Sequence, residues 1–478
     1  MIYKVLKKLH FIANPLHFKI YTFAIRIRKQ HLFDIYYQNK MTLKSILANF
    51  KIETLNEMQQ AALDLIPKGN DLILISPTGS GKTLAFLLPI LELLSDKKEG
   101  VQVLILVPSR ELALQIESVF KQMSTNYKIN CCYGGHAIRI EKNNFQHPPD
   151  VLVGTPGRIA YHIRNENVVI RETHTLVLDE FDKSLEFGFK EEMSFIIQQL
   201  TKLQKRILTS ATPLKEIPEF VRLHKPIELN YTKNEAQQTN SSLIIKEVRA
   251  VGLDKLSALL LLIGKLDAQS KIIFCNHRDA VERISELLTS RNVEHGIYHG
   301  GLDQIDREKV LIKLRNGSIQ LLLTTDLAAR GLDIPEIDAI IHYQLPTTED
   351  IMIHRNGRTA RMHANGTAYF LLEEKDYLPP FLKTKPELET LPDKFMQPKS
   401  CEWKTLYIAA GKKDKINKMD IVGMLLQKGG LQKEELGKID VLDHSAYAAI
   451  KSSKILKTLE KISSEKIKNR KIKMEISS

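Results

Sequence analysis

The segment that most constrains the fold is a short apolar run followed by a glycine-containing loop and then by apolar residues at helical spacing. The run Leu72–Ile75 is too short for a buried helix and is ended by Ser-Pro, which predicts a fully buried strand. From Lys82 to about Leu94 the apolar spacing becomes helical. A strand, a glycine loop and a helix in this order are typical of a phosphate cradle, because loop N–H groups and a helix N-terminus both attract anions.

Each residue type of this loop has a chemical role in such a cradle. The two glycines adopt conformations that a side chain would forbid, so that backbone N–H groups can point inward. Lys82 would reach the β- and γ-phosphates, and the Thr83 hydroxyl would ligate Mg²⁺. The predicted nucleotide-binding residues of the loop are Thr78, Gly79, Ser80, Gly81, Lys82 and Thr83. Because Ser76 stands where the strict pattern has Gly, an ordinary strand-to-helix turn is the alternative.

An acidic pair follows a second buried strand, Thr175–Leu178. Asp179 at the end of this strand would hold the Mg²⁺ that Thr83 also contacts. Glu180 is placed to orient or deprotonate an attacking water. A solvated turn is the alternative for any acidic pair, but its combination with a phosphate cradle favours catalysis.

Short apolar strands alternate with helical stretches from Val101 to Thr212, which predicts a parallel sheet with crossover helices. Ligands of such sheets lie outside the carboxyl ends of the strands, so the loops that follow the strands should meet at one edge. These loops cover residues 108–113, 134–135, 155–158, 179–182 and 210–212. Gln59, upstream of the cradle, can pair with an adenine through its amide, although most glutamines are surface residues.

The alternation restarts after a polar, irregular stretch at residues 231–242. This second half contains no second phosphate loop in its sequence, so it is expected to supply residues to a shared site. Arg358 and Arg361 would lie on one face, where guanidinium groups can stabilise charge on a γ-phosphate. Structural salt bridges are the alternative role for these arginines.

Length and charge set the domain count and the class of partner. The 478 residues are too many for one core, and two to four domains are expected. The net charge of +13 divides into +7 for residues 1–40, +7 for residues 401–478 and −1 for the rest. Basic ends suggest contact with an anionic partner. The four cysteines lack metal-binding spacing and are predicted to be reduced core thiols.

The N-terminal extension, residues 1–40, mixes basic and aromatic residues and contains one acid, Asp34. It is either a basic arm for RNA or a membrane surface, or the product of a start assigned too early. We favour the second interpretation, because Met41 opens a segment whose pattern fits the downstream chain.

Taken together and in this order, the motifs resemble those of the DEAD-box RNA helicases of superfamily 2. The similarity runs from about Met41 to Leu372 and includes nearly every motif of the family. It implies an α/β fold with two tandem RecA-like parallel-sheet domains, an ATP-binding domain at residues 41–230 and a helicase C-terminal domain at 243–378, joined by the linker 231–242. The domains would close over ATP, Mg²⁺ and single-stranded RNA.

The resemblance also implies a role for each matching residue. Gln59 would read adenine, Asp333 would contact the nucleotide, and His354 would contact the other domain or water. The implied catalytic residues are Lys82, Asp179, Glu180, His354, Arg358 and Arg361, and the residues that couple hydrolysis to unwinding are Asp182, Ser210 and Thr212. The implied RNA contacts are Pro108, Arg110, Gly135, Thr155, Gly157 and Arg158 from the first domain and His299, Gly300, Thr324 and Thr325 from the second. Phe181 stands where the family has Ala, and we expect activity to survive this change.

The C-terminal part begins after a proline-rich stretch, residues 379–400, which is predicted to be a linker. Residues 401–478 predict strands at 403–408, 437–441, 447–451 and 471–476 and helices at 418–427 and 454–462, an order typical of a small α+β RRM-like domain. The stretch 406–415, with 437–439, resembles the RNA-binding domain appended to DbpA-type DEAD-box proteins. Tyr407 and Tyr447 are candidates for base stacking, and Lys412 and Lys413 for phosphate binding, with a solvated lysine surface as the alternative.

The leading hypothesis is therefore an ATP-dependent RNA helicase that unwinds short duplexes. Through its C-terminal part it would bind ribosomal RNA and assist ribosome assembly. The alternative is an ATP-gated RNA clamp or chaperone with little unwinding. A DNA translocase is disfavoured because the motif set is that of RNA helicases. We expect a cytoplasmic monomer without a membrane partner.

Overall fold

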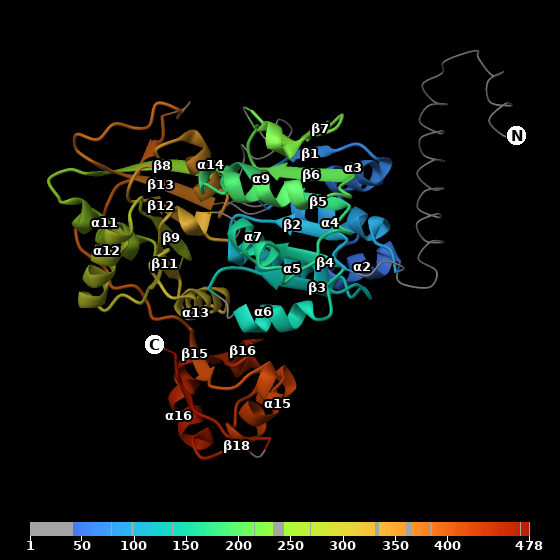
Figure 1. Cartoon of the computed structure of the whole chain (residues 1–478). Coiled ribbons are helices and arrows are strands. Elements are labelled where there is room, and N and C mark those ends of the chain that lie inside the picture. Colours follow the sequence, from blue (N-terminus) through green and yellow to red (C-terminus); the bar gives the residue numbers. More distant parts are fainter. Residues whose placement is uncertain are drawn as a thin grey trace, which may run out of the picture.

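The computed structural model forms two large sheet domains that lie side by side and a small domain beneath them (Figure 1). It describes residues 42–77, 79–96, 100–135, 138–214, 216–232, 243–267, 269–329, 334–359, 366–382, 385–468 and 470–477. The predicted extension 1–40, most of the linker 231–242, and the site residues Thr78, Asp333 and Arg361 lie outside the described residues. Within the described ranges, no helix is both long enough and apolar enough to span a membrane.

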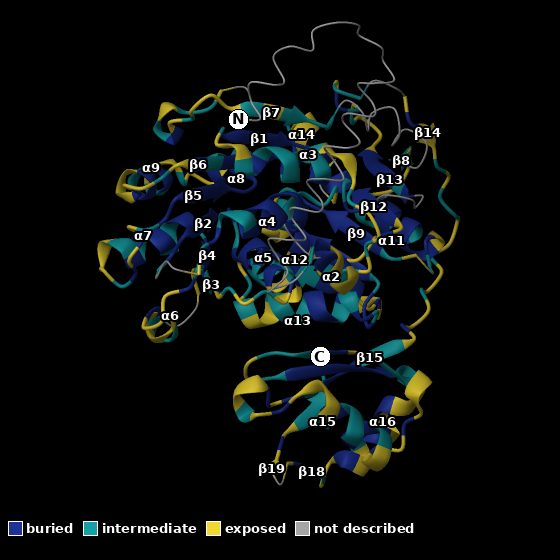
Figure 2. Cartoon of the chain, turned by 90° about the vertical axis from the view of Figure 1, so that its right-hand side faces the viewer, coloured by how far each residue is buried: buried dark blue, intermediate teal, exposed yellow. Residues whose placement is uncertain are grey.

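Domain 1 is built on a seven-stranded parallel sheet with the strand order β3-β4-β2-β5-β6-β1-β7. Its strands are β1 (Leu72–Ile75), β2 (Val103–Leu106), β3 (Ile129–Cys132), β4 (Val151–Gly154), β5 (Thr175–Leu178), β6 (Lys205–Ser210) and β7 (Ile227–Asn230). Its helices are α2 (Leu43–Asn49), α3 (Glu57–Leu65), η3 (Ile66–Lys68), α4 (Lys82–Leu93), α5 (Arg110–Gln122), α6 (Ile138–Phe145), α7 (Pro156–Arg164), α8 (Phe181–Glu186), α9 (Lys190–Gln199) and η4 (Glu219–Val221). The central strands are buried along their whole length, because helices cover both faces of the sheet (Figure 2).

The strand order sorts the predicted site loops of domain 1 into two groups. The loops with nucleotide-binding motifs follow β5, β6 and β1, which are neighbours in the sheet. The loops with predicted RNA contacts follow β3, β4 and β2, which are also neighbours. One edge of the sheet therefore carries two adjacent halves with different predicted ligands.

Domain 2 contains a second seven-stranded parallel sheet, with the order β10-β11-β9-β12-β13-β8-β14. Its strands are β8 (Leu243–Ala250), β9 (Lys271–Phe274), β10 (Gly296–Tyr298), β11 (Leu321–Thr324), β12 (Ala339–His342), β13 (Gly366–Glu373) and β14 (Glu387–Leu388). Its helices are α11 (Lys255–Lys265), α12 (Arg278–Ser290), α13 (Gln304–Arg315), η6 (Asp326–Ala329) and α14 (Glu349–Asn356). The fold class predicted for both large domains is confirmed.

The described part of the proline-rich stretch packs along domain 2. Residues Glu387–Leu388 form the edge strand β14, which pairs with β8. Glu389 forms ion pairs with Lys246 and Lys265, and Phe395 packs against the domain 2 core. Prolines are tolerated in edge segments as well as in linkers, so composition did not distinguish the two.

The C-terminal domain has the predicted βαββαβ order, and its sheet is antiparallel with the order β16-β17-β15-β20. Its elements are β15 (Trp403–Ile408), η7 (Lys412–Asp414), α15 (Lys418–Gly423), the π-helical turn η8 (Met424–Lys428), η9 (Lys433–Glu435), β16 (Leu436–Val441), β17 (Ala446–Lys451), α16 (Ser452–Ile462), β18 (Lys466–Ile467), β19 (Arg470–Lys471) and β20 (Met474–Ile476). The last predicted strand is thus divided, because residues 470–471 pair with β18.

One face of this small sheet is docked on domain 2. The buried Thr405 hydroxyl accepts a hydrogen bond from Asn316 Nδ2 at 2.9 Å and donates one to Ser318 Oγ at 2.8 Å. Trp403 lies against Gly317, and Lys404 forms an ion pair with Glu294. Buried polar side chains that satisfy one another in this way define a fixed contact.

Candidate functional site

The phosphate cradle predicted from the sequence has the expected backbone. Gly79 and Gly81 have φ angles of 87° and 88°, a region that favours glycine. Gly81 is the N-cap of α4, and among the described residues no side chain caps this helix. Lys82 Nζ donates hydrogen bonds to the carbonyls of Ser76 and Pro77, the latter at 2.8 Å. The loop therefore holds its lysine above an open helix N-terminus.

Gln59 lies directly against this cradle. Its Nε2 donates to the Gly81 carbonyl at 3.3 Å, and its Oε1 accepts the Asn56 N–H at 3.1 Å. The side chain is buried, with 5% of its surface exposed. A residue 22 positions upstream in the chain is thus placed beside the start of α4.

The acidic pair lies at the end of β5, also facing the cradle. Burial raises the pKa of Asp179, and a hydrogen bond from the Thr209 hydroxyl opposes this shift. Burial, and next the Asp179 charge, raise the pKa of Glu180 to about 7, while Lys82 and Arg358 act in the opposite direction. Glu180 has φ 46°, a strained conformation for a residue with a side chain and one that clusters at functional sites.

The predicted coupling residues lie around this pair. Ser210 Oγ donates to the Thr212 carbonyl at 2.6 Å and accepts the Thr212 N–H at 3.2 Å, which closes a tight turn. Asp182 lies in the first turn of α8, and its carboxylate is 4.0 Å from His354 Nε2 of domain 2. The described coupling residues therefore include a contact between the two domains.

Domain 2 reaches the acidic loop from α14 and from the turn after this helix. His354 and Arg358 are each only 1% exposed. Arg358 Nε donates to the Ala329 carbonyl at 2.9 Å, and its charge acts on Glu180 of domain 1. Side chains of both domains therefore contribute to one site.

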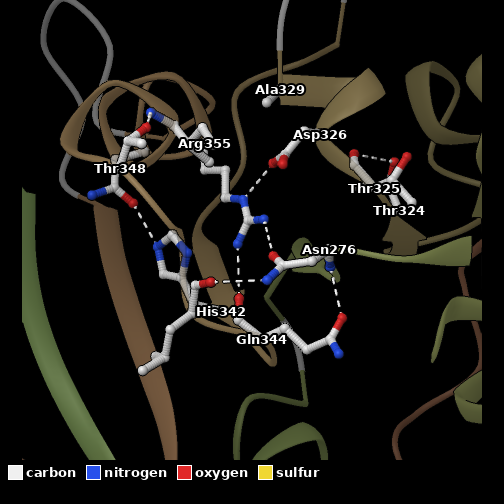
Figure 3. A network of polar contacts seen from close by, with 12 residues as sticks. Asn276, Thr324, Thr325, Asp326, Ala329, His342, Gln344, Thr348 and Arg355 are labelled. Carbon is white, nitrogen blue, oxygen red and sulfur yellow. Dashed lines mark hydrogen bonds and ion pairs between the residues drawn. The ribbon is translucent and has the colours of Figure 1, made fainter. Parts of the chain in front are cut away.

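A fully buried arginine positions α14 (Figure 3). Arg355 donates to Asp326 at 2.6 Å, to Asn276 Oδ1 at 2.7 Å and to the Gln344 carbonyl at 2.8 Å. These partners follow three different strands, β11, β9 and β12. Nearby, burial and the Arg355 charge lower the pKa of His342 to about 3, so this imidazole is neutral. The network fixes the helix that carries His354.

The predicted RNA contacts of domain 1 lie together at the other half of the sheet edge. Pro108, Arg110, Gly135, Thr155, Gly157 and Arg158 follow β2, β3 and β4. Arg110 Nη1 donates to the Gly134 carbonyl at 3.3 Å, and burial, with the Arg307 charge next, lowers the Arg110 pKa. Thr155 is the N-cap of α7 and its side chain forms no capping hydrogen bond.

The predicted RNA contacts of domain 2 follow β10 and β11, at the matching edge. His299 is buried and accepts the Gly301 N–H at 3.2 Å, and Gly300 is exposed. Thr324 is buried and its hydroxyl donates to the Tyr298 carbonyl at 2.7 Å, whereas Thr325 is half-buried. The turn at Gly300 and the Thr325 side chain are therefore the accessible parts.

In the C-terminal domain the predicted contacts differ in exposure. Lys412 and Lys413 are exposed, and Lys413 pairs with Asp443 at 3.0 Å. Tyr407 is half-buried, with its ring 5.4 Å from that of Tyr447. Tyr447 is only 2% exposed, and the acids Glu308 and Asp306 of α13 face it. In this arrangement Tyr447 offers no face to a base.

Several contributing residues were missed at the sequence level. Thr209 bonds to Asp179, and Arg307 of domain 2 contacts Glu111 of domain 1 at 3.5 Å. Arg355 lies between His354 and Arg358, but no pattern in the sequence assigned it a role. These pairs are distant in sequence, and the only available signal was their position beside a recognised motif.

Phe181 is accommodated by the core rather than by the site. Its side chain is fully buried and packs with Phe220, with the ring centroids 6.5 Å apart. The ring thus belongs to the hydrophobic cluster behind β5 and β6. The residues on either side, Glu180 and Asp182, stay at the site.

Two RecA-like sheets, one phosphate cradle and basic side chains supplied by the second sheet define the class of two-domain nucleoside triphosphatases. Residues 56–220 match the family described as DEAD/DEAH box helicase, residues 254–363 match the helicase conserved C-terminal domain, and residues 405–476 match the DbpA RNA binding domain. The chain is 30% identical over 429 residues to the ATP-dependent RNA helicase DbpA of Escherichia coli, which covers 87% of this chain and 93% of that protein.

Two further similarities agree with these matches. The ATP-dependent RNA helicase DRS1 of Yarrowia lipolytica is 32% identical over 327 residues, 66% of this chain and 43% of that protein. The structure of S. cerevisiae Dbp5 bound to RNA and ADP BeF3 has a TM-score of 0.61 at 28% identity, covering 69% of this chain and 88% of that one. The chain belongs to the DEAD-box family of ATP-dependent RNA helicases, an RNA-stimulated class of ATPase.

Proposed function

We propose that the protein couples RNA-stimulated ATP hydrolysis to the local unwinding of short RNA duplexes. The observation that supports this most directly is the meeting of two domains at the acidic loop. His354 Nε2 lies 4.0 Å from the Asp182 carboxylate, and the Arg358 charge opposes the rise in the Glu180 pKa that burial causes. A site shared between domains works only when they are together, which links nucleotide chemistry to domain closure.

Each predicted nucleotide-site residue then has a task. Lys82 leaves the carbonyls of Ser76 and Pro77 to bind the β- and γ-phosphates, and Gln59 binds the adenine. Glu180 orients the attacking water and accepts its proton, and Arg358 stabilises the charge that develops on the γ-phosphate. Asp333 and Arg361, outside the described residues, are proposed to contact the nucleotide from domain 2.

The site also fits a magnesium ion. Mg²⁺ prefers hard oxygen ligands, and the Thr83 hydroxyl and the Asp179 carboxylate are of this kind. Burial raises the pKa of Asp179 because it disfavours the charged carboxylate. A cation beside Asp179 would stabilise this charged form and so offset the effect of burial. Mg²⁺ would neutralise charge on the β- and γ-phosphates. Thr83 and Asp179 are the residues that would hold it.

We propose that RNA crosses the edges of both sheets beside the nucleotide. At the N-terminus of α7 the Gly157 N–H and the Thr155 hydroxyl would contact a phosphate, because the Thr155 N–H already donates to the Cys132 carbonyl. The exposed turn at Gly300 and the Thr325 side chain would bind the same strand from domain 2. Contacts to phosphate and sugar are sequence-independent, and closure of the domains would bend the strand out of duplex geometry.

We further propose that the C-terminal domain binds ribosomal RNA and that the protein acts in ribosome assembly as a cytoplasmic monomer. The match to the DbpA RNA binding domain and the excess of 17 basic over 10 acidic residues in 401–478 support RNA binding there. Lys412 and Lys413 on one exposed turn are proposed to bind phosphate.

Glu180→Gln tests the catalytic assignment. RNA-stimulated ATP turnover should fall by about 10²- to 10⁴-fold, because the amide cannot accept a proton, while nucleotide binding persists. The exposed Glu191→Gln variant carries the same charge change away from the site and should retain activity. Unchanged turnover in Glu180→Gln would remove Glu180 from this role.

A strand-separation assay distinguishes unwinding from clamping. The unaltered protein with ATP should release one strand of a short duplex and then dissociate. RNA that is retained without strand separation would favour the ATP-gated clamp.

A panel of RNAs tests the role of the C-terminal domain. Ribosomal RNA fragments should stimulate ATPase at lower concentration than unrelated RNAs of equal length, and Lys412→Glu should reduce this preference. Lys68→Glu, an exposed site in domain 1, is the matched control. Equal stimulation by all RNAs for all three proteins would contradict the tethering role.

A further inference from the structure

A buried carboxylate in α6 has no part in the nucleotide site described above. Glu141 is 2% exposed, and its Oε2 accepts hydrogen bonds from Arg158 Nε and His162 Nε2, both at 2.7 Å. Its Oε1 accepts the backbone N–H of Tyr133 at 3.2 Å. Despite burial, these bonds hold the pKa of Glu141 below its usual value, so the group is ionised.

Two of the three partners of Glu141 lie at segments that are predicted to bind RNA. Tyr133 immediately precedes Gly134 and Gly135, and Arg158 lies in the first turn of α7, after its N-cap Thr155. Only 14% of the Arg158 side chain is exposed, so the salt bridge to Glu141 fixes most of this residue. One carboxylate therefore ties together the loops that follow β3 and β4.

The loop after β2 is linked to the same group of contacts. Arg110 Nη1 donates to the Gly134 carbonyl at 3.3 Å. A β-carbon at Gly135 would lie 2.7 Å from Arg110 Nη1, so the two loops are in close contact. The contacts run from Arg110 to Gly134, and from the adjacent Tyr133 through Glu141 to Arg158, so they connect all three predicted RNA-binding segments of domain 1.

The same cluster has the composition of a metal site, since Cys132, Glu141 and His162 offer ligand atoms within 4.8 Å of one another. Its chemistry does not suit a cation. The Arg158 guanidinium already occupies Glu141, so a metal ion would face a like charge at close range. Burial, and next the Glu141 charge, raise the pKa of the Cys132 thiol, which disfavours the thiolate that a metal would need. The cluster is therefore a hydrogen-bonding network.

We propose that Glu141 is a positioning residue for RNA binding. Its carboxylate holds the Gly134–Gly135 turn and Arg158, in the first turn of α7, in the relative positions that binding of an RNA backbone requires. His162 bonds to the same Glu141 oxygen as Arg158, and its Nδ1 in turn lies 3.2 Å from Asn167 Nδ2. This inference rests on the proposed RNA surface of domain 1.

Glu141→Gln is the principal test. The amide keeps the size of the side chain but loses the charge, and its NH₂ group cannot accept from a partner. We expect the RNA concentration for half-maximal ATPase to rise roughly tenfold, because loss of one buried charged hydrogen bond costs about that factor. The maximal turnover at saturating RNA and the affinity for nucleotide without RNA should stay unchanged. The exposed Glu166→Gln at the end of α7 is the matched control.

A double-mutant cycle with Arg158→Met distinguishes positioning from general damage. Because Glu141 acts partly through Arg158 and partly through the Gly134–Gly135 turn, the losses of RNA affinity in the two single variants should add to more than the loss in the double variant. Equal losses in nucleotide affinity, melting temperature and RNA affinity would overturn the inference. Should Glu141→Gln fail to fold, His162→Asn leaves Glu141 paired with Arg158 and should raise the half-maximal RNA concentration about threefold; no change in RNA affinity for this variant would also overturn it.

The cycle also separates this inference from the function on which it rests. An Arg158→Met variant with unchanged RNA affinity would contradict the proposed RNA surface itself. An Arg158→Met variant that binds RNA more weakly, beside a Glu141→Gln variant that binds it normally, would overturn only the positioning role.

Discussion

The two large domains have the same strand order but start their corresponding helices differently. β1 lies between β6 and β7 in domain 1, and β8 lies between β13 and β14 in domain 2. α4 follows β1, and its N-cap is Gly81, which has no side chain to cap the helix. α11 follows β8, and its N-cap is Asp254, whose carboxylate accepts the N–H groups of Leu256 and Ser257.

This difference decides which domain can bind a phosphate. An uncapped helix N-terminus offers free N–H groups and a partial positive charge. In α11 the aspartate already uses two of these groups and places a negative charge where a phosphate would lie. The two domains therefore differ in the cap of the corresponding helix, and only the helix start of domain 1 suits the phosphate binding that we propose.

Domain 2 contributes basic side chains in place of a cradle. Arg358, 1% exposed, acts on Glu180 across the domain boundary. Arg358→Ala should therefore reduce ATP turnover at saturating RNA by about a thousandfold or more, as expected for an arginine that stabilises phosphoryl-transfer charge. Single-turnover hydrolysis measures this, and nucleotide affinity of domain 1 should be retained.

The exposed Arg291→Ala variant, also in domain 2, controls for loss of a positive charge. If Arg358→Ala hydrolyses ATP within a few-fold of the unaltered rate, domain 2 does not supply a catalytic arginine to the nucleotide site of domain 1. The proposed difference in role between the two domains would then be wrong.

Gly81→Ala should have the next largest effect. A β-carbon there would lie 2.5 Å from Gln59 Nε2, and φ 88° is unfavourable for alanine. We expect ATP affinity to fall roughly tenfold, measured by titration with a fluorescent nucleotide, because the cradle and Gln59 must separate. Gly69→Ala has the same φ with no atom within 4 Å and controls for backbone strain alone.

A change at the corresponding cap residue of domain 2, Asp254, should lower the free energy of unfolding and leave ATP binding unaffected. Asp254→Ala removes a helix cap, which costs about 1 kcal/mol, and leaves the ATP affinity unchanged. Chemical denaturation and the same nucleotide titration measure both quantities. A tenfold loss of ATP affinity in Asp254→Ala would show that the two helix starts do not have separate roles.

The sequence predicted local features well because each leaves a short signal. The apolar run at Leu72–Ile75 and the glycines after it specify a strand and a turn by composition alone, and β1 and the positive φ angles agree. The order of β-strands and helices in all three domains followed from the same periodicity.

Contacts between distant residues could not be predicted in this way. The Arg355–Asp326 pair spans 29 positions, and the Glu141–Arg158 pair joins α6 to α7 across 17 positions. An arginine that supports a helix and one that faces a nucleotide have the same letter in the sequence. Burial does not distinguish the two, since Arg355 and Arg358 are both almost fully buried. Their contacts do: Arg355 bonds to residues that follow three strands of its own domain, whereas the Arg358 charge acts on Glu180 of domain 1.

The contact around Thr405 determines which half of the enzyme carries its attached RNA-binding module. Asn316 and Ser318, both in domain 2, hold β15 through buried hydrogen bonds. Any transcript segment bound by this module therefore moves with domain 2 whenever the two large domains separate. If the large domains separate during the proposed cycle, this contact would keep the module at a constant distance from domain 2, and its distance from domain 1 would change.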